Sequence, residues 1–380
     1  AAEVGTGGST PAAVTASIGT APMRAAALGT TLGTAAAVGT SIGTSAAVVS
    51  GTSTITVGVG DGPTITHTTA AEAIGGLGIF LIGMIIMTNG LKLAIASPLK
   101  KLLLSFTKNP YSGALSGTIM TALLQSSSAT IVTAVGFVGA GIIGFSEALG
   151  IIFGANLGTT ITGWIVVLFG FKLQLEIFIV PLVLIGAILK LFFKGNLANI
   201  GYAMAGFGLI FAGIATMQNE VIGLESIILL ENISSSSWIN IVKLLVIGII
   251  FTMITQSSSA GVAATLTILY AGMIDFEQAA ALVIGMDVGT TFTAIIATIG
   301  GNINVRRTGF AHVIFNILTA IGAVFLILPF IKLCNFIDIG FISNNSEIAL
   351  VIFHSTFNLL GVLIILPFTK YFAKFMKSII

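Results

Sequence analysis

Long apolar stretches, each bounded by polar or charged positions, run through the chain from about residue 72 onward. Seven of them approach or exceed the roughly 20 residues that a helix needs to cross the hydrocarbon core of a bilayer. We expect membrane-spanning helices at 74–91, 147–170, 175–193, 198–218, 278–300, 308–332 and 348–369. The pattern therefore predicts an all-α polytopic membrane protein.

Two further apolar segments, 110–141 and 239–273, are interrupted in the middle by the polar sequence Gln-Ser-Ser-Ser. A polar interruption at membrane depth is tolerated only where the backbone lines a cavity or is buried in protein. We therefore predict that each segment is a re-entrant hairpin, which enters the membrane and returns to the same side with Gln-Ser-Ser-Ser at its tip.

The N-terminal segment 1–70 has a different composition from the rest of the chain. It consists almost entirely of Ala, Gly, Thr, Ser and Val, contains no aromatic Phe, Tyr or Trp, and carries charge only at Glu3, Arg24 and Asp61. A segment with so few large apolar side chains cannot bury much surface. We predict that residues 1–70 form a weakly ordered, low-complexity tail that is not part of the membrane domain.

Composition agrees with a membrane protein and excludes several other classes. Of the 380 residues, 56% are hydrophobic and 7% are charged, and the mean hydropathy is +1.10. A soluble protein carries about 25% charged residues. The 15 basic and 13 acidic residues nearly balance, so no nucleic-acid partner is expected. The single cysteine, Cys334, permits no internal disulfide. A homodimer is one assembly that the sequence leaves open.

The two interrupted segments belong to a duplication, in which one constant shift aligns two pairs of motifs. The sequence Gln125–Ser128 falls on Gln256–Ser259, and Gly154–Thr160 falls on Gly285–Thr291. From Gln125 to Gly163, 15 of 39 positions are identical in the two copies. We assign residues 71–200 to the first repeat and 201–380 to the second.

Basic residues indicate how the repeats lie in the membrane, because cytoplasmic loops are enriched in Lys and Arg. The loop between the first predicted span and the first hairpin contains Lys92, Lys100, Lys101 and Lys108. If this loop is cytoplasmic, the first hairpin opens to the cytoplasm, the second opens to the exterior, and the C-terminus is cytoplasmic. The repeats are then inverted, which is typical of secondary transporters.

The hairpin tips have the chemistry of an anion site. Serine is a preferred N-cap, and the free N–H groups and dipole at a helix N-terminus attract anions. Two such tips meeting near the middle of the membrane would suit a compact oxyanion. The candidate substrate-binding residues are Gln125, Ser126, Ser127, Ser128, Gln256, Ser257, Ser258 and Ser259.

A bound anion would need positive charge from elsewhere, because no Lys or Arg occurs between Lys108 and Lys172 or between Lys243 and Arg306. The repeated Gly-x-Asn/Asp-x-Gly-Thr-Thr motif offers only oxygen ligands, which suit a hard cation such as Na⁺. Its acidic member would lie inside a span, where an ionisable residue is a functional candidate by default. The candidate Na⁺ ligands are Gln125, Asn156, Thr159, Thr160, Gln256, Asp287, Thr290 and Thr291.

A second motif, His-x-x-Phe-Asn, occurs at His312–Asn316 and again at His354–Asn358. We interpret it as a set of structural contacts between helices in preference to a ligand set. The remaining histidine is His67, and no nucleophile and base lie at a useful spacing, so the sequence does not predict an enzyme.

Two Gln-Ser-Ser-Ser motifs, each followed by Gly-x-Asn/Asp-x-Gly-Thr-Thr, resemble those of the type II sodium-dependent phosphate cotransporters, in particular the bacterial branch. The stretches Gly76–Met84 and Thr121–Thr130 are also similar to that branch, and the resemblance covers about residues 72–370. It implies Na⁺-coupled symport of inorganic phosphate across the inner (cytoplasmic) membrane by alternating access. Phosphate would lie between the serine tips, with the coupling ion Na⁺ near the same motifs and no other cofactor.

Three features depart from this family. The family pattern usually has Asn at the position of Asp287, and residues 1–70 have no counterpart in it. Many bacterial members also carry a cytoplasmic PhoU-like domain, which is not expected in the residues up to Ile380. Two alternatives stay open at this point. One is a transporter of another small oxyanion, such as sulfate or arsenate, or of a carboxylate; the other is a channel-like or non-transporting membrane protein.

Overall fold

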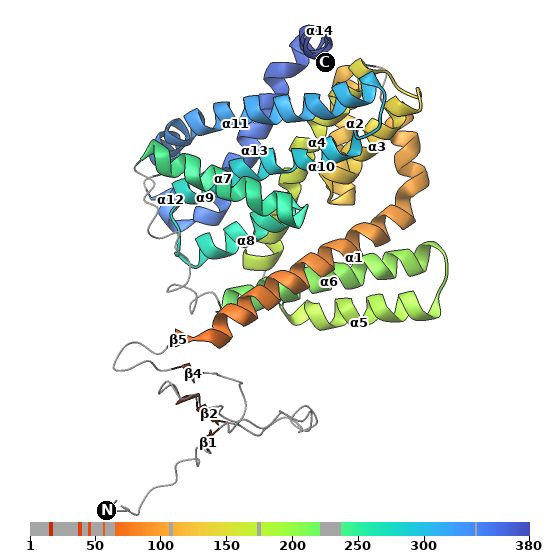
Figure 1. Cartoon of the computed structure of the whole chain (residues 1–380). Helices are drawn as coiled ribbons and strands as arrows, with labels where there is room; N and C mark the ends of the chain where they lie inside the picture. The colour runs from red at the N-terminus through yellow and green to blue at the C-terminus, as the bar shows by residue number, and fades with distance from the viewer. Residues whose placement is uncertain are drawn as a thin grey trace, which may run out of the picture. The chain divides into compact units, whose positions relative to one another are not determined.

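The computed structural model describes residues 15–17, 37–39, 45–46, 56–57, 65–105, 109–172, 176–220, 237–338 and 340–380 (Figure 1). The chain divides into two compact units, Ala1–Ile74 with Glu220–Ile228 and Gly75–Asn219 with Leu229–Ile380. The predicted weakly ordered tail at 1–70 falls mostly outside the described residues and stays a prediction.

Short strands are described in the first unit: β1 (Thr15–Ser17), β2 (Ala37–Gly39), β3 (Ser45–Ala46), β4 (Thr56–Val57) and β5 (Ile65–Thr66). Strand β2 pairs with β1 in parallel and with β3 in antiparallel orientation, and β4 pairs with β5 in antiparallel orientation.

The second unit is entirely helical in its described residues. Its elements are α1 (His67–Ser105, which begins in the first unit), α2 (Pro110–Leu124), α3 (Ser127–Gly139), α4 (Phe145–Ile165) with a π-helical extension η2 (Val166–Lys172), α5 (Glu176–Phe192), α6 (Asn196–Glu220), α7 (Trp238–Thr255), α8 (Ser258–Tyr270), α9 (Phe276–Gly289), α10 (Thr291–Ala297), α11 (Ile303–Ile337), α12 (Phe341–Asn344), α13 (Ser346–Ile365), the 3₁₀ turn η5 (Leu366–Phe368) and α14 (Thr369–Ile379).

Seven helical segments in the described part of the chain are long and apolar enough to cross a membrane. They are Ile74–Ile95, Phe145–Lys172, Asn196–Gln218, Trp238–Thr255, Phe276–Ala297, Ile303–Ile337 and Ser346–Ile379. The prediction of a polytopic helical membrane protein is therefore confirmed.

Three details differ from the sequence prediction. The predicted span 175–193 forms α5, whose 17 residues measure about 25 Å and are short for a bilayer core of about 30 Å. Helix α7, predicted as the first arm of the hairpin 239–273, has 18 residues and counts among the candidate spans. Helix α1 continues to Ser105 where a loop was predicted after residue 91, because Leu, Ala and Lys in this stretch favour a helix.

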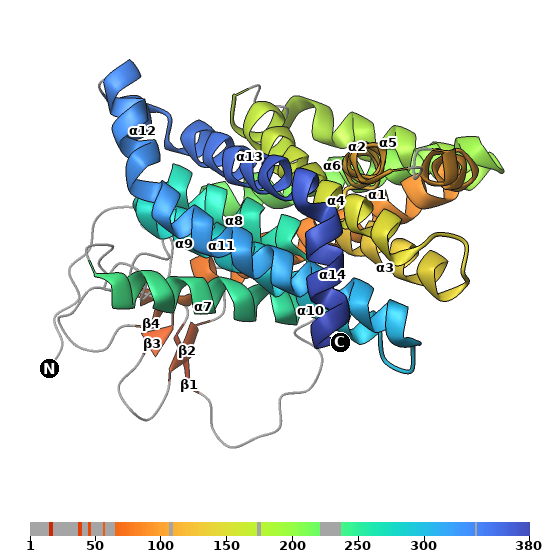
Figure 2. The same ribbon diagram turned by 90° about the horizontal axis from the view of Figure 1, so that it is seen from above.

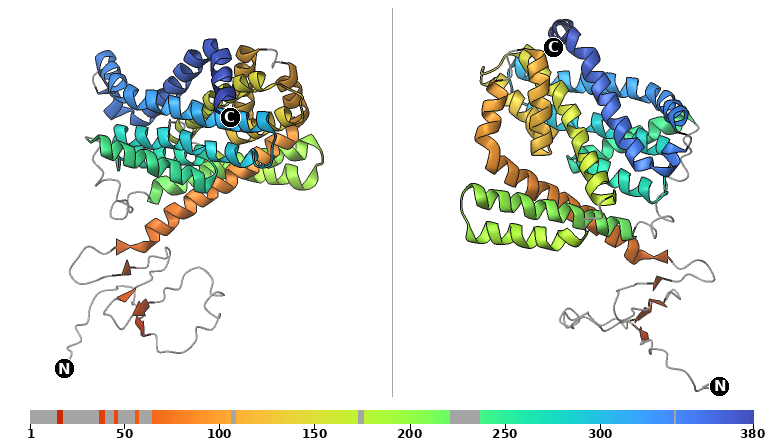
Figure 3. Two further views of the ribbon diagram at one scale, coloured as in Figure 1. Left: turned by 45° about the horizontal axis from the view of Figure 1, so that its top comes forward. Right: turned by 180° about the vertical axis from the view of Figure 1, so that it is seen from behind.

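Glycines allow α1 and α6 to pack backbone against backbone. A Cβ atom added at Gly83 of α1 would lie 2.6 Å from the backbone nitrogen of Ile210, and one added at Gly76 would lie 2.9 Å from that of Met217. Contacts this close exclude any side chain, as is common where membrane helices associate through small residues. Gly186 of α5 lies likewise against the backbone of Ala205 of α6, so α1 and α5 both pack on α6 (Figure 3).

The same close packing joins α2 to α4 and α7 to α9. Gly154 and Gly158 of α4 lie against the backbone of α2, and Gly285 and Gly289 of α9 lie against the backbone of α7. The two pairs of glycines occupy positions that align in the predicted duplication, and they make equivalent contacts. The spans that contain α4 and α9 are the most buried of the seven candidates, at 72% each.

Candidate functional site

Each Gln-Ser-Ser-Ser sequence lies where one helix ends and the next begins. Gln125 ends α2 with φ 52° and ψ 34°, and Gln256 ends α7 with φ 55° and ψ 21°. They are the two non-glycine residues with positive φ in the described part of the chain. The left-handed conformation is unfavourable for a residue with a side chain, and residues held there often belong to functional sites.

The serine after each glutamine caps the following helix. The Ser126 hydroxyl accepts a hydrogen bond from the backbone N–H of Ala129, and the Ser257 hydroxyl accepts one from Ala260, both at 3.2 Å. The first N–H groups of α3 and α8 have no acceptor within their own helix. They belong to the next two serines of each motif, of which Ser127, Ser258 and Ser259 are buried and Ser128 is half-buried.

The glutamine side chains are held in the same way in both copies. Each Nε2 donates to the backbone carbonyl three residues earlier, at 2.6 Å for Gln125 and 2.7 Å for Gln256. Each Oε1 accepts a hydrogen bond from a threonine hydroxyl, that of Thr162 at 2.9 Å and that of Thr293 at 2.8 Å. These two threonines were not among the predicted site residues, although they occupy equivalent positions in the two predicted repeats.

One of the threonines also links the two copies of the motif. The Thr162 hydroxyl lies 3.2 Å from the hydroxyl of Ser259, so Gln125, Thr162 and Ser259 form a continuous hydrogen-bonded chain from the first motif to the second. Gln125 in this chain of hydrogen bonds is buried, whereas Gln256, its counterpart in the second motif, is exposed.

The four threonines of the Gly-Thr-Thr sequences are buried: Thr159 and Thr160 lie in α4, Thr291 begins α10, and Thr290 lies between α9 and α10. Each hydroxyl donates to a carbonyl three or four residues earlier in the chain, which leaves its lone pairs free to accept a hydrogen bond or to face a cation. The distances are 3.1 Å for Thr159, 2.8 Å for Thr160, 3.0 Å for Thr290 and 2.7 Å for Thr291.

Asn156 of α4 contacts a histidine of α11. Its amide nitrogen donates to the carbonyl of Ile152 at 3.3 Å, and its Oδ1 lies 3.3 Å from Nε2 of His312. Since Oδ1 can only accept, Nε2 of His312 is the donor. Both side chains are buried, as is Asn316 one turn later.

Asp287 of α9 occupies the equivalent position and contacts α13. Its two carboxylate oxygens each lie 3.3 Å from Nε2 of His354, and Oδ2 also accepts a hydrogen bond from Nδ2 of Asn358 at 2.8 Å. All three side chains are buried. A buried carboxylate requires such partners, because an unpaired charge at this depth is costly.

The His-x-x-Phe-Asn motifs thus do more than the sequence suggested. They are contacts between helices, as predicted, but their partners are Asn156 and Asp287, two of the predicted Na⁺ ligands. The sequence signal that could have identified them is the occurrence of the same motif on two late spans.

Several predicted site residues are not joined directly. In the part of the chain that the structure describes, no hydrogen bond connects Asn156 or Asp287 to either serine motif. Four buried acceptor or ring atoms in the His-x-x-Phe-Asn motifs also have no partner there, namely His312 Nδ1, Asn316 Oδ1, His354 Nδ1 and Asn358 Oδ1. Buried polar atoms of this kind usually have a partner such as water or an ion.

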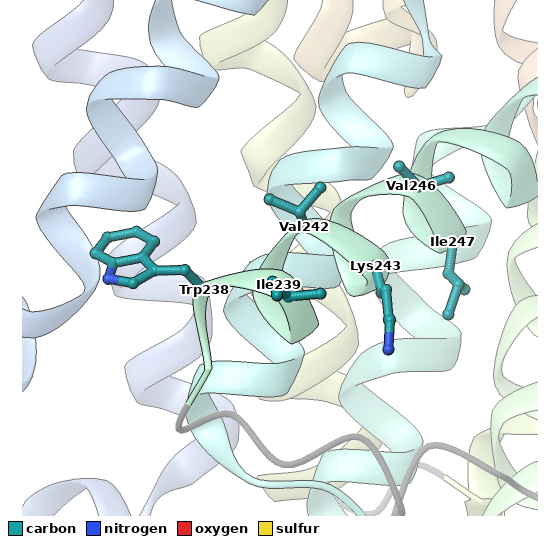
Figure 4. A pocket seen from close by; sticks show the side chains of 6 residues that line it. All are labelled: Trp238, Ile239, Val242, Lys243, Val246 and Ile247. Carbon is teal, nitrogen blue, oxygen red and sulfur yellow. The ribbon is translucent and has the colours of Figure 1, made fainter.

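A hollow of about 620 Å³ on the outer face of α7 is separate from these residues (Figure 4). It is lined by Trp238, Ile239, Val242, Lys243, Val246 and Ile247. All six of these described residues come from one helix, and they are apolar apart from the lysine. Among the residues that the structure describes, the hollow therefore lacks the polar groups expected of the site.

Comparison with known proteins gives matches over most of the chain. The family model described as Na⁺/Pi-cotransporter matches residues 79–219 and 228–343. A Bacillus subtilis (strain 168) protein named "Uncharacterized protein YqeW" is 32% identical over 308 residues, which cover 79% of this chain and 95% of that protein. No solved structure matches the chain.

A second relative carries a functional name. The Escherichia coli (strain K12) protein named "Putative inorganic phosphate export protein YjbB" is 30% identical over 262 residues, which cover 69% of this chain and 46% of that protein. The chain therefore spans about half the length of this relative.

Proposed function

Because the chain belongs to the Na⁺/Pi-cotransporter family, we propose that it is a secondary active transporter that carries inorganic phosphate across the membrane in symport with Na⁺. Membership of a transporter family implies a protein that is not an enzyme. The observation that carries the proposal is the hydrogen-bonded chain from Gln125 through Thr162 to Ser259, since it brings the two serine motifs together.

In this proposal, phosphate binds between the two serine motifs. The N-termini of α3 and α8 contribute free backbone N–H groups, the positive ends of two helix dipoles and the serine hydroxyls. Phosphate oxygens are acceptors, so a site built from donors fits them. Gln125 and Gln256 would also face the anion through their Nε2 groups if they exchange partners on binding, and Ser127 and Ser258 would contact it first.

Na⁺ supplies the charge that the motifs lack. No Lys or Arg lies between Lys108 and Lys172 or between Lys243 and Arg306, so a multiply charged anion has no fixed cation in either segment. We propose that Asn156, Asp287 and the threonines of the Gly-Thr-Thr sequences provide oxygen ligands for Na⁺, together with Gln125 and Gln256. Hard cations prefer such ligands.

The His-x-x-Phe-Asn motifs would position two of these ligands. His354 and Asn358 each donate to the Asp287 carboxylate, and His312 donates to Asn156. Fixing a ligand through its other hydrogen bonds is the general role of residues that surround an ion site. The unpartnered Oδ1 atoms of Asn316 and Asn358 are further oxygen ligands available next to the same positions.

The inverted arrangement gives this site alternating access. Helices α2 and α3 are separated only by Gln125 and Ser126, and α7 and α8 only by Gln256 and Ser257. We propose that both pairs are re-entrant hairpins, the first open to the cytoplasm and the second to the exterior. A rearrangement of one repeat against the other would then expose a fixed site to each side in turn.

The direction of transport has two candidates. The family description names cotransport of Na⁺ and phosphate without a direction, and we propose uptake into the cell, whereas the name of the relative YjbB refers to export of inorganic phosphate. A symporter runs in whichever direction the combined gradients of Na⁺ and phosphate dictate. Reversing the gradients across a vesicle therefore distinguishes a reversible symporter from an exporter that does not use Na⁺.

Radiolabelled phosphate uptake into proteoliposomes tests the function. We expect uptake to require an inward Na⁺ gradient, to stop when Na⁺ is replaced by K⁺, and to fall at least tenfold in Ser127→Ala and Ser258→Ala. Ser343→Ala is a matched control, since this hydroxyl is exposed on α12 and donates only to the carbonyl of Gly340. Uptake that is independent of Na⁺, or equal in all variants, would refute the proposal.

Competition separates the alternatives for the substrate. An excess of unlabelled arsenate, sulfate or a small carboxylate is added to the same assay. Inhibition by phosphate and arsenate alone supports a site for tetrahedral, partly protonated oxyanions. Stronger inhibition by sulfate or by a carboxylate would assign the site to that anion, and the absence of any flux in vesicles with folded protein would favour a non-transporting role.

A further inference from the structure

The last helix, α14, carries three distinct faces, of which one is buried. It follows α13 through η5, where Pro367 ends the preceding helix. Figure 1 shows α14 end-on and Figure 2 shows it along its length. Phe372, Ala373 and Met376 form the buried face, which packs on α4. There the ring of Phe372 meets the ring of Phe153 edge to face, with centroids 5.6 Å apart.

The second face is basic and exposed. Lys370, Lys374 and Lys377 are spaced by four and three residues, so they lie along one side of the helix. All three side chains are exposed, and in the described part of the chain none of them takes part in an ion pair. No acidic residue occurs between Glu347 and Ile380 to neutralise them.

The third face is apolar and equally exposed. Tyr371, Phe375 and Ile379 are spaced by four residues, and their side chains are 73%, 50% and 50% exposed. An aromatic and aliphatic row of this kind beside a lysine row is unfavourable in water. It is typical of a helix that lies in the membrane–water interface, with its apolar side in the acyl boundary and its basic side among the headgroups.

We propose that α14 is an interfacial helix that binds anionic phospholipid headgroups through Lys370, Lys374 and Lys377. Tyr371 and Phe375 would then reach the outer part of the acyl chains. The charge is complementary to the cytoplasmic leaflet, which carries anionic lipid, and this is the side that the basic residues of the chain predict for the C-terminus. The proposal does not depend on the transported substrate.

The two exposed faces together select a lipid over other partners. An acidic protein surface could neutralise the lysines, but it would have to cover the adjacent apolar row as well. A phospholipid leaflet provides both surfaces at the depth where long lysine side chains can extend to the headgroups. Because α14 packs on α4 through Phe372, lipid bound here would also hold α14 against the helix that carries Asn156.

Native mass spectrometry measures the headgroup preference. The purified full chain in detergent is incubated with an equimolar mixture of phosphatidylglycerol and phosphatidylcholine, and the retained lipids are counted. We expect the chain to prefer phosphatidylglycerol, with the preference falling as NaCl is raised. The triple variant K370Q/K374Q/K377Q should reduce this preference about tenfold or more.

The matched control K194Q/K243Q/K332Q removes the same number of exposed lysines from elsewhere in the chain and should retain the preference. An equal preference in the wild type and in the K370Q/K374Q/K377Q variant would overturn the proposal. So would a loss of preference of the same size in the control, since the effect would then reflect net charge.

Fluorescence quenching tests the apolar face independently. Phe375→Trp adds a fluorophore to the exposed row, and the full chain is reconstituted with phosphatidylcholine brominated either near the glycerol end or near the middle of its acyl chains. We expect the added emission, measured against the wild type, to be quenched more by bromine near the glycerol end. If neither brominated lipid quenched the added emission, α14 would lie away from the bilayer and the proposal would be refuted.

Discussion

Gln125 and Gln256 share a backbone conformation and a threonine partner, but they differ in their surroundings. Gln125 is buried and its Oε1 depends on the Thr162 hydroxyl, whereas Gln256 is exposed and water can replace the hydroxyl of Thr293. The threonine hydrogen bond therefore contributes more to stability at Gln125 than at Gln256, because a buried acceptor left without a donor keeps its full desolvation cost.

This difference predicts unequal effects of the same substitution. Thr162→Val, which keeps the shape of the side chain, should lower the free energy of unfolding by about 1–3 kcal/mol and weaken phosphate binding. Thr293→Val should cost less than about 1 kcal/mol. Thermal melting of the purified protein and a phosphate titration measure both quantities. Equal losses in the two variants would contradict the role given to burial.

Asp287 introduces a charge where the equivalent residue, Asn156, has none. In a site of low dielectric constant, a carboxylate attracts a cation much more strongly than an amide does. Asp287→Asn should therefore lower the apparent Na⁺ affinity by about tenfold or more, roughly 1.4 kcal/mol. The hydrogen bonds from His354 and Asn358 can persist, since an amide oxygen also accepts, so the change tests charge and not folding.

The measurement is a sodium titration of phosphate uptake, together with the ratio of charge moved to phosphate moved. The double variant N156D/D287N is the matched control, since it moves the carboxylate to the equivalent position without changing the net charge. An unaltered sodium titration in Asp287→Asn would remove Asp287 from the proposed ion site.

At the scale of whole elements, the contact between α1 and α6 leaves no space for an added side chain at the contacting glycines. Gly83 lies against the backbone of α6, whereas a Cβ atom at Gly78 of the same helix would have no neighbour within 4 Å. Gly83→Ala should lower the melting temperature, because one methyl group must push two backbones apart at a cost of about 1–3 kcal/mol. Gly78→Ala should leave it unchanged or raise it slightly, since alanine favours a helix. Thermal melts of both variants measure the difference. Equal melting temperatures would contradict the close contact between Gly83 and the backbone of α6.

The elements were largely predictable because hydrophobic length and polar breaks act locally. The polar Gln-Ser-Ser-Ser sequences were predicted to interrupt their segments, and helices do end at Gln125 and Gln256. Boundaries were less predictable. A continuous apolar run does not reveal whether α5 stops short of a full span or whether α1 continues to Ser105, because several helix lengths satisfy the same pattern.

The long-range partners could not be predicted from spacing. His312 contacts Asn156 of a much earlier helix, and His354 likewise contacts Asp287. A helical pattern indicates which face of a helix is buried, but not which helix lies against that face. Thr162 and Thr293 could not be predicted as site residues for the same reason. Their hydrogen bonds to the glutamines form only because α4 packs beside the end of α2 and α10 beside the end of α7.

For the molecule as a whole, the proposed inverted arrangement of the two repeats makes a prediction about topology. Ala140 and Ala271 are equivalent, exposed residues at the ends of α3 and α8. In a background with Cys334→Ala, Ala140→Cys should react with a membrane-impermeant maleimide only from the cytoplasmic side, and Ala271→Cys only from the exterior. Labelling of right-side-out and inverted vesicles measures this. Reaction of both cysteines from the same side would contradict inverted repeats.

The central claim is that two serine motifs, one from each repeat, form one phosphate site. Calorimetric titration of the purified protein with phosphate, at saturating Na⁺ and with Na⁺ replaced by K⁺, tests it most directly. The account predicts a single phosphate per chain, binding that requires Na⁺, and an affinity reduced by about tenfold to a hundredfold in Ser127→Ala and Ser258→Ala alike. Two phosphates per chain, with each variant losing one and leaving the other unchanged, would show that the motifs act separately and would contradict it.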